Sequence, residues 1–280
     1  MHRIITLTTD LGYQDYFVGA IKGKIRSKGI ENEVIDISHG VSFYNIEEAG
    51  FVVSAAYKHF PKGTIHIVAV SCEITESTKP ILVLFDGHYF VSADNGTLSF
   101  LFKEPDRAQV VYLHHENFEE SIDVFINAVK QLNQGKELEE VGVLTDKITQ
   151  FSGVNLTISS DRRVIRGNVI YEDHFGNAIT NISKSIFEDI RNGRNFEIKV
   201  KNRFIKKINK YFSDFNTSES VSINDKVGDL LAIFNDLDYL QISIFHSSPN
   251  GPGSPKSLIG LELRDSITIE FEDKPDEIIL

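Results

Sequence analysis

The sequence of 280 residues contains a single cysteine, Cys72, and no tryptophan. One cysteine excludes a disulfide within the chain, and a lone thiol is typical of proteins kept in the reducing cytoplasm. No stretch approaches the roughly 18–20 consecutive apolar residues that a membrane-spanning helix needs. Residues 1–7 lack the apolar segment and cleavage site of a secretory signal. We therefore expect a soluble, cytoplasmic protein that does not associate with a membrane.

Positive charge is also scarce, with 29 Lys and Arg against 40 Asp and Glu, a net charge of -11 at pH 7. Proteins that bind nucleic acid normally present a basic surface, so we do not expect nucleic acid as a partner. The sequence has no dinucleotide-binding GxGxxG, P-loop, HExxH, CxxC or GxSxG motif. The adjacent pair His114 and His115 would point apart at a strand end, so no metal site is expected.

The first half of the chain alternates apolar strands with amphipathic helices. Residues 3–9 are short, apolar and β-branched, which predicts a buried strand, and a helix pattern follows them. The unit then repeats, with Asn45 predicted to cap the second helix. Asp86 and Gly87 separate two apolar runs and indicate a hairpin, so the sheet should be mixed. We predict an α/β domain with a mixed central sheet over residues 1–158.

The second half reads differently. Short alternating or apolar runs separated by turns dominate it, and only residues 183–190 show a helical pattern. This composition is typical of a small β-sandwich or barrel. We predict a smaller, all-β, barrel-like domain over residues 159–280, and place the boundary near residues 155–163, where the segment 159–163 is polar.

Polar residues at predicted strand ends are the candidates for chemistry. Asp10 follows the first strand, where a carboxylate can accept two hydrogen bonds from a ribose diol, but a turn residue is an equally good interpretation. Asp15 is better explained as a helix N-cap. Phe175 could stack on a purine and Asn177 could bind its polar edge. The alternative is a plain β-turn, which the local pattern favours.

Five segments of the sequence form a set. They read TLTTDLGYQDYFVGAIKGKI at 6–25, DISHGVSFYNIEEAGF at 36–51, HFPKGTIHIVAV at 59–70, SADNGTLSF at 92–100 and GNVIYEDHFGNAITNI at 167–182. Together they resemble the S-adenosylmethionine hydroxide adenosyltransferases, relatives of the fluorinase and chlorinase enzymes. The resemblance implies an N-terminal α/β domain, a C-terminal β-barrel, and a homotrimer. It also implies ligand sites where one subunit's N-domain meets its neighbour's C-domain.

The resemblance assigns roles to residues of the first domain. Asp10 falls at the carboxylate that binds the ribose diol, and Asp15 is the second acid of that loop. Tyr44 falls at an aromatic residue that packs against the nucleoside.

In the second domain, the resemblance pairs Asp173 with the methionine ammonium group. It makes Phe175 the residue that stacks on adenine and Asn177 its polar neighbour. One departure concerns the family's N-S-x-G turn, which grips the substrate carboxylate. Here it reads Asn235-Asp236-Leu237-Asp238, and an aspartate would repel a carboxylate.

The residues that surround the attacking water also depart from the family. The hydrolases carry an Asp-Arg-His set, and this chain has Ser71, Thr78 and Glu120 at those positions. The halogenase pattern is absent too. We expect slow hydrolysis of S-adenosylmethionine to adenosine and methionine, with Glu120 as the general base and no cofactor. The alternative is an inactive module that binds or senses adenosine or S-adenosylmethionine.

Overall fold

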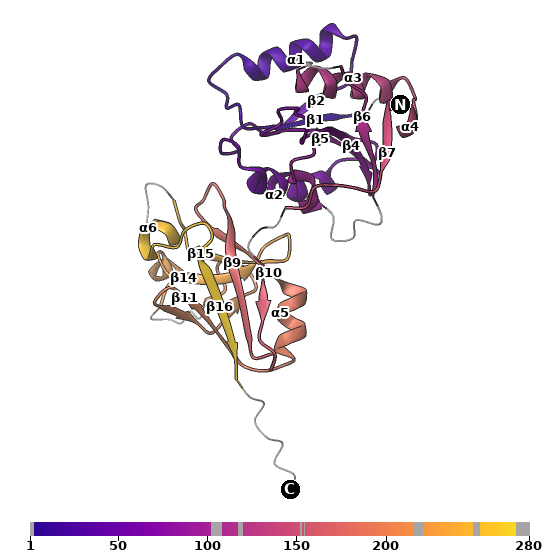
Figure 1. The fold of residues 1–280 in the computed structure, drawn as a ribbon. Helices are drawn as coiled ribbons and strands as arrows, with labels where there is room; N and C mark the ends of the chain where they lie inside the picture. Colours follow the sequence, from indigo (N-terminus) through magenta and orange to yellow (C-terminus); the bar gives the residue numbers. More distant parts are fainter. Residues whose placement is uncertain are drawn as a thin grey trace. The chain divides into compact units, whose positions relative to one another are not determined.

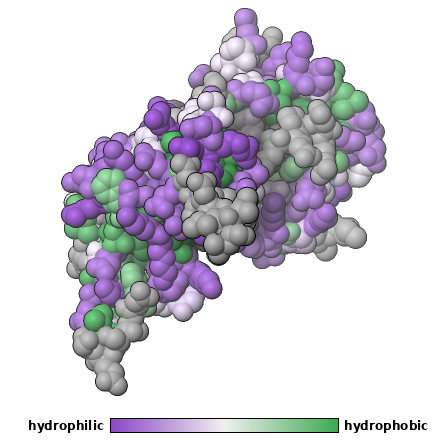
Figure 2. Space-filling view, turned by 90° about the horizontal axis from the view of Figure 1, so that it is seen from below, coloured by the Kyte–Doolittle hydropathy of each residue, from purple (hydrophilic) through white to green (hydrophobic). Residues whose placement is uncertain are grey.

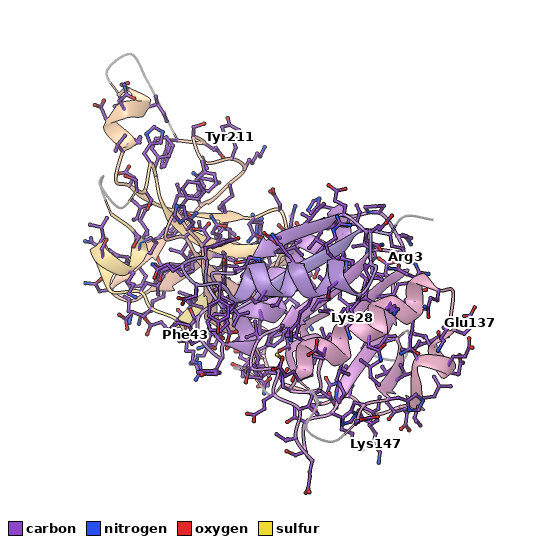
Figure 3. All side chains as sticks on the ribbon, turned by 90° about the horizontal axis from the view of Figure 1, so that it is seen from above. Arg3, Lys28, Phe43, Glu137, Lys147 and Tyr211 are labelled. Carbon is purple, nitrogen blue, oxygen red and sulfur yellow. The ribbon has the colours of Figure 1, made fainter. Side chains whose placement is uncertain are left out.

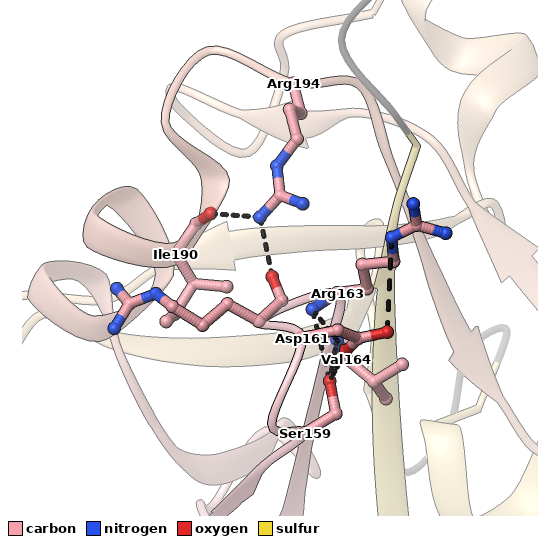
Figure 4. Close-up of polar contacts among 7 residues, drawn as sticks. Ser159, Asp161, Arg163, Val164, Ile190 and Arg194 are labelled. Carbon is pink, nitrogen blue, oxygen red and sulfur yellow. Dashed lines mark hydrogen bonds and ion pairs between the residues drawn. The ribbon is translucent and has the colours of Figure 1, made fainter.

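The computed structural model describes residues 3–101, 108–116, 120–151, 153, 155–215, 221–248 and 253–272. The chain forms two compact units, Met1–Phe151 and Ser152–Leu280 (Figure 1). The polar segment 159–163, where the sequence suggested a boundary, is the turn of a hairpin that belongs to the second unit. In that turn the Ser159 hydroxyl accepts hydrogen bonds from the backbone N–H groups of Arg163 and Val164 (Figure 4).

The first unit is a layered α/β fold. Its elements are β1 (Ile5–Thr9), α1 (Phe17–Ser27), β2 (Val34–Ser38), α2 (Ile46–Ala56), β3 (Ile65–Ala69), β4 (Pro80–Phe85), β5 (His88–Ala93), β6 (Gln109–Leu113), α3 (Ser121–Asn133), α4 (Leu138–Val141) and β7 (Gly142–Thr145). Short 3-10 helices lie at Tyr57–His59 and Thr97–Leu101.

The strands form one mixed sheet in the order β2-β1-β3-β5-β4-β6-β7. β2, β1, β3 and β5 are parallel, whereas β4 is antiparallel to both β5 and β6. Residues of α1 and α3 pack on one face and residues of α2 on the other (Figure 1). The predicted mixed α/β sheet is therefore confirmed. The parallel arrangement brings the carboxyl ends of β2, β1, β3 and β5 to one edge.

Of three local predictions in this unit, two are confirmed and one is wrong. Asn45 caps α2 as predicted, because its Oδ1 accepts a hydrogen bond from the Glu48 N–H. Asp86 and Gly87 both have positive φ, at 48° and 77°, as the tight turn between β4 and β5 requires. The predicted N-cap at Asp15 is wrong. α1 begins at Phe17, and Tyr16 is its N-cap, with no side-chain cap hydrogen bond.

The second unit is mostly β-structure. Its elements are β8 (Thr157–Ile158), β9 (Val164–Glu172), β10 (Ala178–Ser183), α5 (Lys184–Arg191), β11 (Phe196–Val200), β12 (Arg203–Ile205), β13 (Ile208–Asn209), a 3-10 helix (Ile223–Lys226), β14 (Leu230–Phe234), β15 (Tyr239–Ile244), α6 (Pro255–Ile259) and β16 (Ser266–Phe271).

These strands form a nine-stranded sheet in the order β12-β11-β16-β9-β10-β15-β14-β13, with β8 paired to β9. The sheet curls so that β12 also lies against β14, which leaves a nearly closed barrel. Its interior is filled by apolar side chains, with Phe187 of α5 packed under Phe196, Phe234 and Phe271. The predicted barrel-like domain is confirmed.

The outer surface is largely hydrophilic, with hydrophobic residues in scattered patches on the face that Figure 2 shows. In the described part of the chain, no helix combines the length and the apolar composition needed to cross a membrane.

Candidate functional site

The carboxyl edge of the first sheet collects several residues from the predicted site. Asp10 follows β1, and Ser71 follows β3. Asn95, just beyond β5, donates hydrogen bonds from Nδ2 to the carbonyl oxygens of Val70 (3.0 Å) and Ser71 (2.9 Å). The ends of β3 and β5 are thus tied together. Polar groups at this edge are the usual location of ligand sites in open α/β sheets.

Asp10 links two of the loops. Its Oδ2 accepts a hydrogen bond of 2.9 Å from the backbone N–H of Tyr44, in the β2–α2 connection. Tyr44 has φ of 61°, a conformation that disfavours a bulky residue, and its side chain is 77% exposed. No described residue donates to Oδ1 of Asp10. The carboxylate therefore holds the loop with one oxygen and keeps the other available.

A buried histidine supports the same loops. The His39 ring lies within 2.8 Å of Thr9 Oγ1 at Nδ1 and 3.1 Å of Asp36 Oδ1 at Nε2. Burial acts to raise the pKa of Asp36, but hydrogen bonds from Lys22 and His39 outweigh it and the pKa is lowered. The His39 carbonyl accepts from Gly12 N–H at 2.8 Å, which fixes the turn after Asp10. No sequence pattern singled out this set, although Asp36 and His39 both lie in the DISHG segment.

Exposed aromatic residues border this edge in the loops that follow β1 and β2 and at the first residue of α1. They are Tyr13, Tyr16, Phe17, Phe43 and Tyr44, with exposed fractions between 41% and 79%. Phe43 is labelled in Figure 3. Asp15 lies among them and is exposed. Neighbouring exposed rings of this kind are typical of surfaces that bind a ligand or another protein.

The segment after β3 lies beside the start of α3. Ser71 has φ of 47°, so the chain turns sharply at the residue that the resemblance aligned with the family's aspartate. Burial and the charge of Asp10 raise the pKa of the Cys72 thiol to about 11, against a hydrogen bond with Ser121. The thiol therefore stays protonated at neutral pH and is a poor nucleophile.

Thr78 and Glu120, which the resemblance aligned with the other two residues of the hydrolytic set, have their own partners. Thr78 closes a small turn, in which its N–H donates to Thr75 Oγ1 and its carbonyl accepts from the Thr75 N–H, both at 3.0 Å. Glu120 is the N-cap residue of α3, and its Oε2 lies 2.7 Å from Lys24 Nζ. Hydrogen bonds with Glu120 and then Asp123 raise the pKa of Lys24. The described residues include no hydrogen bond that joins Thr78 to Glu120.

The second unit carries the other predicted residues in the β9–β10 hairpin. Asp173 Oδ1 accepts from the backbone N–H groups of Phe175 and Asn177, each at 2.9 Å, and Oδ2 accepts from Asn177 Nδ2 at 2.8 Å. Gly176 has φ of 78°, which this turn requires. The turn interpretation is therefore correct for the backbone. The same turn leaves the Phe175 ring 63% exposed.

A cavity of about 850 Å³ adjoins this hairpin. Asp173, Phe175 and Asn177 form part of its wall, together with Asn235 and Asp236 of the β14–β15 turn. The β9–β10 hairpin and the β14–β15 turn, which the sequence linked only through the family, are thus neighbours in one cavity. Its size is typical of a small-molecule site.

Other lining residues were not found from the sequence. Tyr211 and Phe212 expose 60% and 43% of their surface at the cavity, and Tyr211 is labelled in Figure 3. His246 stacks on Phe245 with ring centroids 4.2 Å apart and has φ of 57°. The aromatic pair in the segment KYFS at 210–213 was the available signal. His246 had none, because its position depends on the path of the chain after β15.

The β14–β15 turn presents an acid to this cavity. Asn235 Oδ1 accepts from the N–H groups of Leu237 and Tyr239, each at 3.0 Å, so its side chain is used within the turn. Asp236 is exposed, and no described residue pairs with its carboxylate. Among the residues that the structure describes, no group of three or more His, Cys, Asp or Glu side chains is placed to hold a metal ion.

Comparison with known proteins identifies the family. Residues 5–142 match the model of the SAM hydroxide adenosyltransferase N-terminal domain, and residues 167–268 match that of its C-terminal domain. The chain belongs to the SAM hydroxide adenosyltransferase family. The predicted resemblance is confirmed over both units.

Relatives with assigned names support this membership. A protein of Methanocaldococcus jannaschii named (R)-S-adenosyl-L-methionine hydrolase is 26% identical, and the match covers 96% of each chain. A protein of Thermus thermophilus with the same name is 23% identical over 65% of this chain and 76% of its own.

Solved structures show the same fold. An uncharacterized conserved protein from Thermotoga maritima matches with a TM-score of 0.77 at 24% identity, covering 95% of this chain and 99% of that one. A conserved hypothetical protein from Thermus thermophilus matches with a TM-score of 0.69 at 18% identity, covering 96% and 100%. At these identities the likeness supports the fold alone.

Proposed function

We propose that this protein hydrolyses S-adenosylmethionine to adenosine and methionine. The observation that carries the proposal is the match of both units to one family, whose named relatives are S-adenosylmethionine hydrolases. The names of those relatives specify the (R)-epimer at the sulfonium centre, so we extend the proposal to that epimer as the preferred substrate.

The reaction itself makes modest demands on the protein. A water oxygen forms a bond to C5′ while the C5′–S bond breaks. The electron pair of the C5′–S bond passes to sulfur and gives methionine. The sulfonium is already a good leaving group, and attack by an oxygen anion neutralises charge, so a dry site favours it. The main tasks are to align oxygen, carbon and sulfur and to accept a proton from the water.

Binding is proposed to use residues of both units. Asp10 would receive the ribose diol on its available oxygen, with Tyr44 against the nucleoside and Asp15 nearby. Phe175 would stack on adenine and Asn177 would bind the polar edge of the ring. Both are in the wall of the 850 Å³ cavity, which supports the assignment.

Asp173 is proposed to bind the methionine ammonium group. Its carboxylate already accepts three hydrogen bonds from the hairpin, which fix its orientation. In a homotrimer, the first unit of one subunit would complete the site with the second unit of its neighbour. The exposed aromatic residues of the loops after β1 and β2 supply apolar surface for such an interface.

Glu120 is the proposed base in place of the missing histidine, with Ser71 and Thr78 at the other two replaced positions. The ion pair with Lys24 positions the Glu120 carboxylate at the start of α3. Lys24 contacts Oε2 alone, so Oε1 would accept the proton of the attacking water. Loss of one positioned acid or base typically costs about 10²–10⁴ in rate, so we expect turnover to be slow.

The test is incubation with each sulfonium epimer, followed by chromatographic measurement of adenosine and methionine. We expect the two products in equal amounts. Hydrolysis should be faster with the (R)-epimer than with the other epimer, and Glu120→Gln should slow it by about 10²-fold or more. Glu139→Gln, an exposed acid at the start of α4, is the matched control. If the protein binds S-adenosylmethionine but forms no adenosine above the spontaneous background, hydrolysis is contradicted and the protein is a binding module. Full activity in Glu120→Gln would contradict only the choice of base.

A further inference from the structure

The barrel of the second unit has an open seam. β12 and β13 stand at the two ends of the strand order, and in the described part of the chain no hydrogen-bonded ladder joins them. β12 approaches β14 at this point without pairing to it. A cavity of about 720 Å³ lies at the seam, with walls from β12, β13, β14 and α6. Ile244 is the one described residue that lines both this seam cavity and the 850 Å³ cavity.

The charge of the seam cavity is opposite to that of the chain. Its lining cations are Arg203, Lys206, Lys207 and Lys226, against the acids Asp214 and Asp229. Both acids are already used, because Asp214 lies 2.8 Å from Lys207 and Asp229 lies 3.4 Å from Lys226. Lys206 is paired as well, at 3.2 Å from Glu197 outside the cavity, so Arg203 is the one lining cation whose charge no described residue pairs. In a protein of net charge -11, this leaves a local excess of positive charge at a concave surface.

A buried donor lies in the same wall. Asn209 of β13 is 7% exposed, and its Nδ2 has no hydrogen-bond partner among the described residues. Buried polar groups are nearly always paired, so an unpaired amide in a cavity wall calls for an acceptor that the chain does not supply. Together with Arg203, the amide suits an anionic oxygen.

The remaining wall is apolar. Phe204 of β12 and Leu258 of α6 expose 58% and 49% of their surface, and Ile259 and Leu231 lie beside the same space. A cavity with a few convergent donors on an apolar wall is the general form of a small-molecule site. An inorganic anion would leave this apolar surface uncovered.

The geometry points to a second binding site at the barrel seam, for a small organic anion with an apolar body, of the class of medium-chain carboxylates. The carboxylate binds Arg203 and the Asn209 amide, and the hydrocarbon covers Leu258 and Ile259. The site does not depend on the proposed hydrolysis, since it lies in a separate cavity.

The probe for this site is octanoate, with octylammonium as the matched cation. Octanoate should bind in calorimetry and raise the melting temperature, whereas octylammonium should do neither. Arg203→Gln should weaken octanoate at least tenfold. Arg166→Gln, an exposed arginine of β9 outside the lining, should leave its affinity unchanged.

Asn209→Leu gives an independent readout, because leucine has a similar size and no donor. The free protein should melt at the same or a higher temperature, since a buried unpaired group is removed, while octanoate affinity should fall at least tenfold. The proposal is overturned if octanoate does not bind, if octylammonium binds equally well, or if both variants retain octanoate. If only Phe175→Ala abolishes octanoate binding, the anion binds in the 850 Å³ cavity. This result would also overturn the proposal.

Discussion

Replacing His66 with glutamine should flatten the dependence of this protein's stability on pH. His66 of β3 and His88 of β5 are 0% and 3% exposed, with His66 Nε2 at 3.2 Å from His88 Nδ1. His66 Nδ1 lies 2.7 Å from Thr6 Oγ1, and its ring stacks on Phe90. Burial and then the neighbouring His88 lower the pKa of His66 from 6.5 to about 3. Burial also lowers the pKa of His88.

The direction of the effect follows from proton uptake. Between pH 6.5 and about 3, the unfolded chain binds a proton at His66 that the native protein does not. The stabilising contribution of neutral His66 is therefore complete above pH 6.5 and decreases as the pH falls. Each pH unit in this window removes about 1.4 kcal/mol. From pH 6.5 to 5.0, His66 alone should lower the free energy of unfolding by about 2 kcal/mol.

The assay is urea unfolding of the wild type and His66→Gln at pH 7.5 and pH 5.0. Glutamine keeps an amide that can reach His88 but does not titrate, so the variant should lose about 2 kcal/mol less than the wild type between the two pH values. The variant will be less stable at pH 7.5, because it loses the stack on Phe90, so only the difference between pH values is used. His59 is an exposed histidine, so His59→Gln should lose as much unfolding free energy between pH 7.5 and pH 5.0 as the wild type does. An equal loss in wild type and His66→Gln would refute the reasoning.

Three further predictions concern ligand binding and assembly. Asp10→Ala should weaken adenosine at least tenfold in calorimetry, because two charge-assisted hydrogen bonds of ~1.5–3 kcal/mol each are lost; unchanged affinity would make Asp10 a turn residue alone. Phe175→Ala should weaken adenosine through lost stacking, by ~1–3 kcal/mol, whereas His174→Ala should not; equal effects would exclude Phe175 as the stacking residue. Light scattering should give three times the chain mass, and a monomer at micromolar concentration would contradict a site shared between subunits.

The fold could be predicted where the signals are local. Asn45 caps its helix through a contact three residues away, and Asp86 and Gly87 form a turn through their own backbone preferences. The N-cap prediction for Asp15 was wrong because an acidic residue in a loop before a helix gives the same sequence pattern whether the helix begins at the next residue or later. Here α1 begins at Phe17.

The site was less predictable, because its members meet through tertiary structure. His39 contacts Thr9 only because β2 pairs with β1, and no sequence spacing indicates that pairing. Tyr211 and His246 reach the cavity of Phe175 from connections far along the chain. No short sequence motif describes a cavity whose lining residues come from distant segments. The family resemblance therefore identified only the lining residues that lie within the family's own motifs.

For the aspartates, turn and ligand roles need not be alternatives. Asp10 binds the Tyr44 N–H through Oδ2 alone, so one oxygen orders the loop while the other faces no described donor. Asp10→Asn tests this division, because an asparagine retains one oxygen for the Tyr44 N–H but loses the charge and the second acceptor. If Asp10 binds ribose, Asp10→Asn should keep the wild-type melting temperature and still lose most of the adenosine affinity. If Asp10 is only a turn residue, Asp10→Asn should bind adenosine like the wild type. The main effect of Asp10→Ala should then be a lower melting temperature.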